Sequence, residues 1–595
     1  MTAAAPAVLD VERSVLGKRW RQRPADDRAA LAIAQRLGVP EIVGRVLAGR
    51  GVGPEEAEAF LNPTLRALLP DPSRLKDMDK AVERIVAALQ GGEKIAVFGD
   101  YDVDGATSAA LLQRFFAALG QPLRIYIPDR RTEGYGPNAA ALRRLAEDGI
   151  TVVITVDCGI AAFDALAAGA EAGLDVIVVD HHLAEPRLPP AHAVINPNRL
   201  DDDSGLGHLA AVGVTFMLVV VLNRALRALR RHGAGGEPDL RQWLDLVALG
   251  TVCDVVPLVG LNRALVVRGL EVIARRGNVG LAALADVGGV KERPGAYHLG
   301  FVLGPRVNAG GRVGEADLGA RLLATDDDAE ARVLAETLDR LNSERRAIEQ
   351  AVLDAALAQI AARPSPPGPL VLAAGDGWHP GVIGIVASRL VGRFGRPACV
   401  IALDGGSGRG SGRSVRGIDL GAAVVAARQA GLLTAGGGHA MAAGFTVGAG
   451  DLEALEAFLG ERIAAQADPD SLGPSLGVDG VLTPAGATTA LLARLAQAGP
   501  YGAGNAEPRF AFADARIAMA DRVGDSHVRA VLADPEGRRL KAIAFRSTET
   551  ALGRTLLDSV GRTLHVAGHL RADNWQGRHG VQLFVEDAAR THGQS

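Results

Sequence analysis

Cysteine is rare in this chain: the 595 residues include 3, namely Cys158, Cys253 and Cys399. Thiols that are so few and so far apart exclude a disulfide framework and a four-thiolate zinc site, and they fit a reducing compartment. The N-terminal stretch MTAAAPAVLDVERSVLGKRW contains no apolar core of a secretory signal. We therefore expect a cytoplasmic protein.

Apolar runs long enough to cross a membrane are also missing. The most apolar stretch, Leu209 to Leu222, is shorter than the roughly 20 residues that a spanning helix needs. Gly213 also interrupts it. We expect no membrane segment.

A surplus of positive charge, common in proteins that bind nucleic acids, is absent as well. Lys and Arg number 64 against 68 Asp and Glu, a formal net charge of −4. Arginine makes up most of the basic residues, which a codon bias toward arginine and alanine would produce without functional meaning. Net charge therefore does not identify a partner.

The hydrophobic share of 48% is ample for several buried cores, and the length corresponds to about three to five domains. Residues 1–92 predict an N-terminal helical arm. Over residues 93–325, short β-branched runs alternate with helical patterns, which predicts a mainly parallel sheet in an α/β domain. The expected strands are Lys94–Phe98, Leu123–Ile127, Thr151–Val156, Val176–Val179 and Ala193–Ile195.

Leucines at helical spacing from Ala329 to Ala362, without Gly or Pro, predict one long helix, which would reach about 45–50 Å. A proline-rich linker follows, so residues 326–367 are interpreted as a strut between domains rather than as one more core helix. Residues 368–465 predict a second, smaller α/β domain. Within 470–595, five short strands at close spacing predict an OB-fold barrel.

Acids and histidines follow several of the expected strands. They are Asp100, Asp102 and Asp104; Asp157; Asp180, His181 and His182; and Asp254, at the end of an apolar run from Leu244. Alone, each fits a helix cap or a satisfied polar group as well as a metal ligand. Because parallel strands gather their loops at one edge, the recurrence predicts a shared site. Carboxylate and imidazole donors without thiolate favour Mn²⁺ or Mg²⁺, and their number predicts two ions.

These motifs resemble those of the DHH phosphoesterase superfamily, and more narrowly its RecJ branch of single-strand-specific 5′→3′ DNA exonucleases. The superfamily motifs are Asp102-Val-Asp104-Gly, Val156-Asp157-Cys, Asp180-His181-His182 and Cys253-Asp254. The RecJ-like segments are Phe60-Leu-Asn-Pro63, Leu303–Arg312, Gly375–Gly384, Gly436–Gly444 and Tyr501–Asn505. Together they span nearly the whole chain.

The resemblance implies a multi-domain α/β fold: a parallel-sheet DHH domain, a long connecting helix, a smaller α/β DHHA1-like domain and a C-terminal OB-fold β-barrel. It implies the metal ligands Asp102, Asp104, Asp157, His181 and Asp254. Asp157 and His182 would be catalytic, with His182 on the scissile phosphate; the alternative for His182 is a structural partner of the acidic loop. Asp100 and Asp180 would orient the ligands. Phe98 stands where related pyrophosphatases have a further histidine ligand.

A 5′-phosphate needs donors on a rigid cradle, which bidentate arginine supplies. Two segments, Gly408–Ser414 and Gly436–His439, are interpreted as Gly-rich loops with such donors, the alternative being flexible turns with unengaged arginines. The resemblance assigns Ser411, Arg413, His439 and Arg130 to the 5′-phosphate, and Arg306, Asn308 and Arg312 to the DNA backbone.

The implied activity is degradation of single-stranded DNA 5′→3′ to 5′-mononucleotides in recombination and repair, by a monomer acting with single-strand-binding protein and a RecQ-type helicase. Two alternatives stay open on the sequence. One is a phosphodiesterase or phosphatase for small substrates such as oligonucleotides, cyclic dinucleotides or pyrophosphate, and the other is a non-catalytic DNA-binding relative. The barrel and strut argue against the first, and the complete set of acids argues against the second.

Overall fold

The computed structural model describes residues 6–129, 132–229, 236–467, 474–573 and 580–591. The chain forms two compact units. The parallel-sheet unit comprises Glu58–Arg345 together with Ala498–Ala506. The other unit, called the two-sheet unit after its two larger sheets, comprises Met1–Ala57, Arg346–Gln497 and Glu507–Ser595.

The core of the parallel-sheet unit is a five-stranded sheet in the order β3-β2-β4-β5-β6, with every neighbouring pair parallel. This confirms the predicted sheet. Its strands are β2 (Lys94–Gly99), β3 (Arg124–Tyr126), β4 (Ile150–Val156), β5 (Asp175–Val179) and β6 (Ala193–Ile195).

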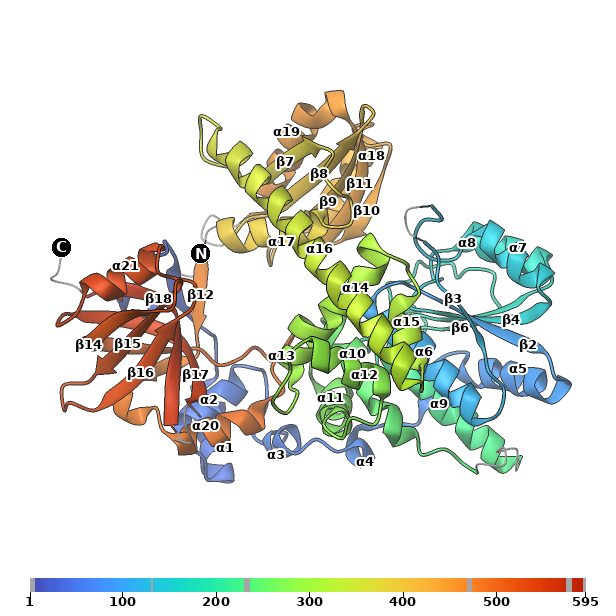
Figure 1. Ribbon diagram of the computed structural model, residues 1–595, viewed down its shortest axis with the longest axis horizontal. Coiled ribbons are helices and arrows are strands. Elements are labelled where there is room, and N and C mark those ends of the chain that lie inside the picture. Colours follow the sequence, from blue (N-terminus) through green and yellow to red (C-terminus); the bar gives the residue numbers. More distant parts are fainter. Residues whose placement is uncertain (1–5, 130–131, 230–235, 468–473, 574–579, 592–595) are drawn as a thin grey trace. The chain divides into compact units, whose positions relative to one another are not determined.

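Helices cover both faces of this sheet, because its strands are apolar on both sides (Figure 1). On one face α7 (Ala139–Glu147) and α8 (Phe163–Glu171) pack against Ala96, Phe98 and Val153. The opposite face carries α5 (Met78–Gly91), α6 (Val103–Ala118) and α9 (Ala211–Ala228). The remaining helices of this unit are α4 (Leu65–Leu68), α10 (Leu244–Cys253), α11 (Gly260–Ile273), α12 (Val279–Val287), α13 (Ala296–His298), η4 (Leu299–Leu303), α14 (Gly304–Val313) and α15 (Leu318–Ala324), with the short turns η2 (Pro72–Arg74) and η3 (Leu240–Trp243).

Helix α9 contains the most apolar stretch of the sequence. It has 18 residues, longer than the sequence predicts, and by length and composition it is the one helix among the described residues that could cross a membrane. Of these residues 72% are buried inside the protein. Its apolar side chains therefore belong to the core beneath the sheet.

The predicted long helix is α16 (Asp328–Ala361), with 34 residues. Its first half belongs to the parallel-sheet unit and its second half to the two-sheet unit. In the second half Val352, Ala356 and Ile360 pack against the first sheet of the two-sheet unit.

The first sheet of the two-sheet unit has the order β10-β11-β9-β8-β7. Its strands are β7 (Val371–Asp376), β8 (Ala398–Asp404), β9 (Ser407–Arg413), β10 (Ala435–His439) and β11 (Ala442–Gly448). Helix α17 (Ile383–Phe394) packs on one face, and α18 (Leu420–Gln429) and α19 (Leu452–Gln466) pack on the other, beside η5 (Ala449–Asp451).

Strands β9 and β10 correct the prediction that their segments are Gly-rich loops. Both lie in regular antiparallel ladders with β11. Some of their glycines are needed because a larger side chain lies against the strand: a Cβ on Gly410 would come within 2.1 Å of the Phe445 ring. A strand of this kind has no hydrophobic alternation to detect in the sequence.

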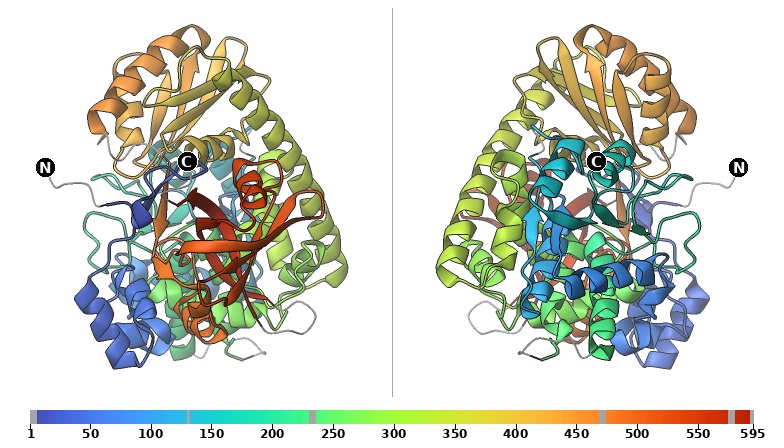
Figure 2. Two further views of the ribbon diagram at one scale, coloured as in Figure 1. Left: turned by 90° about the vertical axis from the view of Figure 1, so that its left-hand side faces the viewer. Right: turned by 90° about the vertical axis from the view of Figure 1, so that its right-hand side faces the viewer.

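The second sheet is a closed barrel in which β14, β15, β16, β18 and β17 follow one another and β17 pairs back onto β14 (Figure 2, red). This confirms the predicted OB-type barrel. Its elements are β13 (Gly480–Leu482), β14 (Phe510–Val523), β15 (His527–Ala533), β16 (Arg539–Ala544), β17 (Thr563–Asp573), β18 (Gly580–Arg590), η6 (Pro484–Gly486), α20 (Thr489–Ala498) and α21 (Ala551–Asp558).

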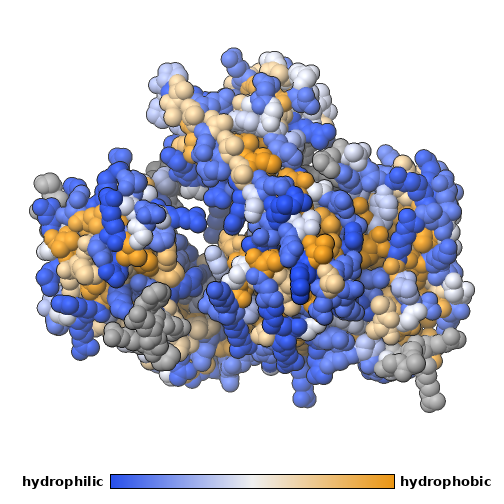
Figure 3. All heavy atoms as spheres, viewed as in Figure 1, coloured by the Kyte–Doolittle hydropathy of each residue, from blue (hydrophilic) through white to orange (hydrophobic). Residues whose placement is uncertain are grey.

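The arm predicted over residues 1–92 is divided between the two units: η1 (Val8–Asp10), α1 (Asp27–Leu37) and α2 (Glu41–Ala48) belong to the two-sheet unit, whereas α3 (Ala57–Leu61), which begins at the boundary, α4 and α5 belong to the parallel-sheet unit. It also contains a strand that the sequence pattern does not indicate, β1 (Arg19–Gln22), parallel to β12 (Ser475–Val478). Trp20 of β1 is fully buried and donates from its indole N–H to Asp587 at 3.0 Å. On the face shown in Figure 3, hydrophobic residues form small areas interspersed among hydrophilic ones.

Candidate functional site

Four strands of the parallel sheet end at the same level. The register pairs Gly99 with Val156, Val156 with Val179, and Val179 with Ile195. The residue that follows each of these strands therefore lies at the same edge of the sheet. Those residues are Asp100, Asp157, Asp180 and Asn196, each at most 5% exposed.

Asp102 and Asp104 belong to the start of helix α6, which follows β2. Asp102 is the N-cap: one of its oxygens accepts from the backbone N–H groups of Asp104 and Gly105 at 2.9 and 3.0 Å. Asp104 is buried and accepts from Ala211 and Val212 at the start of α9. Gly105 allows the close turn, because a Cβ there would lie 2.4 Å from the Asp100 carbonyl oxygen. The cap and ligand interpretations of Asp102 are thus compatible, since a carboxylate has a second oxygen.

His181 lies at the centre of the acids. Its Nε2 is 3.4 Å from an oxygen of Asp157, 3.6 Å from one of Asp254 and 3.9 Å from one of Asp104. Asp157 has a φ of +61°, a strained backbone that non-glycine residues adopt mainly where function or packing requires it. Asp254 arrives differently from the prediction: it is the C-cap of the buried helix α10, not the end of a strand.

The donors fall into three groups whose ligand atoms lie within 4.8 Å of one another. They are Asp104, His181 and Asp254; Asp157, His181 and His182; and Asp100, Asp102 and Asp157. Asp157 and His181 each belong to two groups. The five sequence-predicted ligands are therefore brought together, with His182 and Asp100 beside them.

Burial and mutual repulsion dominate the electrostatics. Burial, followed by the charge of Asp102, raises the pKa of Asp104 and Asp157 above the usual range, and burial together with Asp104 does the same for Asp254. Burial lowers the pKa of His181 to about 4, so its imidazole is neutral and has a lone pair to offer.

Several polar atoms of the cluster are buried without a hydrogen-bond partner among the described residues: Asp157 Oδ1, His181 Nε2 and Asp254 Oδ2. Buried polar atoms are rarely left unpaired in folded proteins. Oxygens and one imidazole nitrogen that converge in this way suit a hard divalent cation such as Mn²⁺ or Mg²⁺.

His182 is held by Asp180. Its Nδ1 is 2.7 Å from an Asp180 oxygen, which also accepts from the backbone N–H of His181 and of His182. Although burial opposes it, the Asp180 hydrogen bond raises the pKa of His182, and the His182 side chain remains 38% exposed. Asn196 donates to the His182 carbonyl oxygen at 2.9 Å. His182 is thus oriented by these contacts and remains accessible.

Tyr135 is a residue that sequence reasoning missed. Its hydroxyl donates to the backbone carbonyl oxygen of Asp157 at 3.2 Å, and its ring meets that of His182 edge-on at 6.4 Å. The side chain is nevertheless 56% exposed. It stands between Gly134 and Gly136, both at positive φ, and a tyrosine framed by two glycines is the signal that could have indicated it.

Three of the predicted phosphate-binding residues lie together in the two-sheet unit. Arg413 on β9 and His439 on β10 are both opposite Ala442 of β11. Directly opposed residues project from the same face of a sheet, and Ser411 shares it because it lies two residues from Arg413.

The sheet surface between these side chains is formed by glycines and is not covered by other side chains. Gly444 of β11 lies opposite Ser411, and Gly437 of β10 lies opposite Gly444; a Cβ on either glycine would have no neighbour within 4 Å. Arg413 donates to Ser411 at 3.1 Å and to the Gly412 carbonyl oxygen at 2.8 Å. Gly384 at the start of α17 approaches both side chains. An anion placed here would find oriented donors near a helix N-terminus.

Of the other predicted contacts, Arg130 falls outside the described residues. Arg306 is engaged internally, since its Nε donates to Asp339 and its Nη1 to the Val302 carbonyl oxygen. Asn308 and Arg312 are half-buried on α14.

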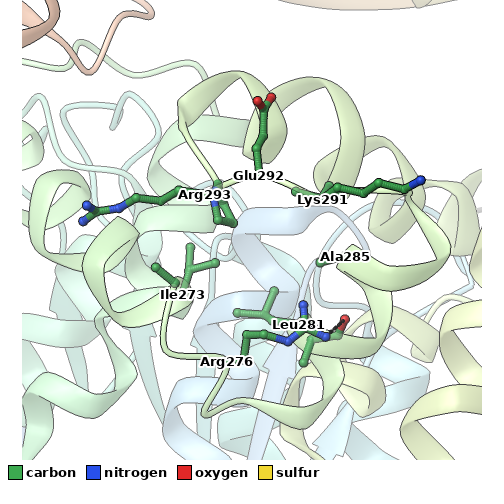
Figure 4. Close-up of a pocket in the computed structure, with 11 residues that line it drawn as sticks. Ile273, Arg276, Leu281, Ala285, Lys291, Glu292 and Arg293 are labelled. Carbon is green, nitrogen blue, oxygen red and sulfur yellow. Dashed lines mark hydrogen bonds between the residues drawn. The ribbon is translucent and has the colours of Figure 1, made fainter. Parts of the chain in front are cut away.

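A separate hollow of about 450 Å³ lies between α11 and the segment after α12 (Figure 4). Ile273, Leu281 and Ala285 form its apolar wall. Figure 4 shows Lys291 and Arg293 extending in opposite directions, so their charges do not converge on one point. This hollow therefore offers no convergent set of charged donors.

Comparison with known proteins identifies three family domains in the chain. The model of the DHH family N-terminal domain matches residues 94–251, that of the DHHA1 domain matches 368–465, and that of the RecJ OB domain matches 478–587.

Curated relatives match over almost the full length. The single-stranded-DNA-specific exonuclease RecJ of Bacillus subtilis is 35% identical over 97% of this chain and 71% of the relative. The enzyme of the same name from Escherichia coli is 36% identical over 95% of this chain and 98% of the relative.

Among solved structures, RecJ from Thermus thermophilus in complex with Mn²⁺ matches with a TM-score of 0.79 at 32% identity, covering 96% of this chain and 79% of that chain. The complex of that protein with Mg²⁺ matches with a TM-score of 0.73 at 30% identity, covering 96% and 78%. With three matching domains and full-length relatives of this identity, the chain belongs to the RecJ family of the DHH proteins.

Proposed function

We propose that this protein is a metal-dependent exonuclease that degrades single-stranded DNA 5′→3′ to 5′-mononucleotides and serves DNA recombination and repair. Curated relatives that match nearly the whole chain are named single-stranded-DNA-specific exonucleases. The observation that carries the proposal is the convergence of buried, unpartnered donor atoms of Asp157, His181 and Asp254 at the carboxyl edge of the parallel sheet.

Asp102, Asp104, Asp157, His181 and Asp254 would hold the metal. Two ions are assigned because Asp157 and His181 each belong to two donor groups. When bound, Mn²⁺ or Mg²⁺ supplies an activated water and neutralises charge on the phosphate. Asp104 is fixed by two backbone hydrogen bonds and Asp157 by its strained backbone, so these ligands are preorganised.

His182 would donate to a non-bridging oxygen of the scissile phosphate. The Asp180 hydrogen bond favours its protonated form and fixes the direction of its ring. Asp100 and Asp180 are assigned as acids that orient the ligand loops. The leaving group is the 3′-oxygen of the released nucleotide.

The 5′→3′ direction of degradation would be set by a pocket that binds the terminal 5′-phosphate. Ser411, Arg413 and His439 would form this pocket, with Arg130. The same-face placement of the first three and the uncovered glycine surface between them support this assignment. Arg306, Asn308 and Arg312 are proposed to contact the DNA backbone.

The assigned domains are the arm at 1–92, the nuclease domain at 93–325, the connecting helix and linker at 326–367, the phosphate-pocket domain at 368–465 and the strand-holding barrel at 470–595. A cytoplasmic monomer that works with single-strand-binding protein and a RecQ-type helicase completes the proposal. The support for these partners is the family resemblance.

An end-labelling assay tests the function directly. Single strands labelled at the 5′ or the 3′ end are incubated with Mn²⁺ or Mg²⁺, with and without EDTA, beside a blunt duplex. We expect early release of the 5′ label as a mononucleotide, a shortening 3′-labelled ladder, no reaction in EDTA and an intact duplex. Release from the 3′ end, or turnover of pyrophosphate or cyclic dinucleotides alone, would contradict the proposal.

A further inference from the structure

The loop Ala498–Ala506 has an unusual position in the chain. It belongs to the parallel-sheet unit, whereas the residues before and after it, in α20 and leading to β14, belong to the two-sheet unit. It contacts the segment that follows Asp254, at Pro257 and Leu258. The loop therefore brings a distant part of the chain to the backbone beside a candidate metal ligand.

The contact is close and specific. The backbone N–H of Leu258 donates to the Ala503 carbonyl oxygen at 2.8 Å. Gly504 lies against Pro257, because a Cβ there would be 2.9 Å from the proline Cβ and 3.2 Å from its Cα. Gly504 also has a φ of +68°, so both its conformation and its surroundings favour glycine.

The loop is rigid enough to act as a support. Asn505 is buried and donates from its side-chain amide to the carbonyl oxygens of Ala498 and Pro500 at 2.8 and 2.9 Å. The backbones of Gly502 and Asn505 also exchange hydrogen bonds, at 2.9 and 3.2 Å. These bonds close the loop on itself.

Arg263 links the loop to the rest of the parallel-sheet unit. This arginine is 1% exposed, lies 4.0 Å over the Phe60 ring and donates to the carbonyl oxygens of Phe60 and Gly499. Burial lowers its pKa to about 10, so the guanidinium remains charged at neutral pH. The RecJ-like segments around Phe60 and Tyr501 therefore meet at one buried cation.

The segment under the loop is strained. Val255, directly after Asp254, has a φ of +63° although its side chain is β-branched, a conformation that persists only when both flanks are held. On one flank the Asp254 N–H closes helix α10 by donating to the Gly250 carbonyl oxygen at 2.9 Å. On the other, Pro257 and Leu258 are held by the loop, and Asn262 donates to the Pro257 carbonyl oxygen at 3.0 Å.

We propose that the 498–506 loop is a positioning element for Asp254, which holds this carboxylate at its place in the metal centre by clamping the strained turn at Val255–Leu258. The inference rests on the proposed function, because it takes Asp254 as a metal ligand. By linkage, metal binding and loop docking favour each other.

The test uses full-length protein and Mn²⁺ alone, with isothermal titration calorimetry. Gly504→Ala is compared with Gly524→Ala. Both glycines have positive φ, +68° and +56°, so both substitutions strain the backbone, but a Cβ at 524 has no neighbour within 4 Å. We expect the Mn²⁺ dissociation constant of Gly504→Ala to rise three- to tenfold and that of Gly524→Ala to stay at the wild-type value.

A second measurement compares the protein with and without Mn²⁺. Hydrogen exchange followed by mass spectrometry should show that Mn²⁺ slows exchange of the amides of Leu258, Gly502 and Asn505 in the wild-type protein. In Asp254→Asn this effect should disappear. If Gly504→Ala does not fold, Gly502→Ala replaces it, since Gly502 has no positive φ and its Cβ would meet Leu258 Cδ1 at 2.8 Å.

The outcomes distinguish the positioning role of the loop from the assignment of Asp254 as a metal ligand. Wild-type Mn²⁺ affinity in the loop variant, or exchange in the loop that is equal with and without Mn²⁺, overturns the positioning role. If Asp254→Asn itself binds Mn²⁺ as the wild-type protein does, the assignment of Asp254 as a ligand fails instead.

Discussion

The proposed 5′-phosphate pocket makes a quantitative prediction for Arg413→Ala. The Arg413 side chain is half-buried, and its Nη1 is already tied to Ser411 and to the Gly412 carbonyl oxygen. The guanidinium is therefore oriented before a ligand arrives, and little entropy is lost on binding. The substitution removes this donor while the β-ladder around it, formed by backbone groups, remains.

The magnitude follows from the kind of bond that is lost. A hydrogen bond between charged partners contributes about 1.5–3 kcal/mol, and each 1.4 kcal/mol corresponds to about a factor of ten. We expect kcat/KM for a 5′-phosphorylated single strand to fall roughly 10- to 100-fold. For the same strand with a 5′-hydroxyl it should fall less than about threefold, because no charged partner is present there.

The assay measures kcat/KM for both strands in competition, with wild-type protein, Arg413→Ala and the control Arg393→Ala. Arg393 is an exposed arginine near the opposite end of α17, so the control removes the same charge away from the pocket. The ratio of the two rates should collapse only in Arg413→Ala. An equal loss on both strands would refute the assignment and indicate a general contribution to DNA binding.

Three further predictions concern other parts of the molecule. Asp157→Ala should abolish cleavage while single-strand binding, measured by fluorescence anisotropy, remains; retained cleavage would contradict the metal centre. Tyr135→Phe removes the hydroxyl that donates to the Asp157 carbonyl oxygen, and we expect kcat/KM to fall about two- to tenfold, as for a neutral hydrogen bond; a wild-type value would exclude this role. In the barrel, although burial opposes it, hydrogen bonds from His569 and Arg509 lower the pKa of Glu586 to about 2. Ionised Glu586 therefore stabilises the fold above pH ~4.5, and this contribution is lost as the pH falls toward 2. Urea unfolding between pH 3 and pH 7 should show a weaker acid dependence in Glu586→Gln, and parallel curves would contradict the assignment.

Much of the acid–histidine site follows from the sequence because it depends on a local regularity. Each of β2, β4 and β5 is a short apolar run followed at once by an acid. Once the strands are parallel, their ends must lie along one edge, and Asp100, Asp157 and Asp180 follow. No long-range information is needed beyond the direction of the strands.

Other parts could not be read in this way. The segments around Arg413 and His439 look like glycine loops because no apolar alternation marks them, yet they pair as β9 and β10. Asp254 reaches the centre from the end of a helix, and Tyr135 reaches it through one hydrogen bond to a carbonyl oxygen. Each of these placements depends on which partner lies opposite, and the partner is remote in the sequence.

The sequence by itself determined the class of fold, the acids and histidines whose side chains suit a divalent metal, and the family that these motifs resemble. All three depend on residue type and short-range spacing. The tertiary structure decided how those residues meet: the distances around His181, the common face of Ser411, Arg413 and His439, and the docking of the 498–506 loop beside Asp254. The physical reason is that charge repulsion, burial and strain are properties of neighbours in space. The net charge of −4 does not say where the arginines lie; folding alone placed Arg263 in the core and Arg413 beside Ser411.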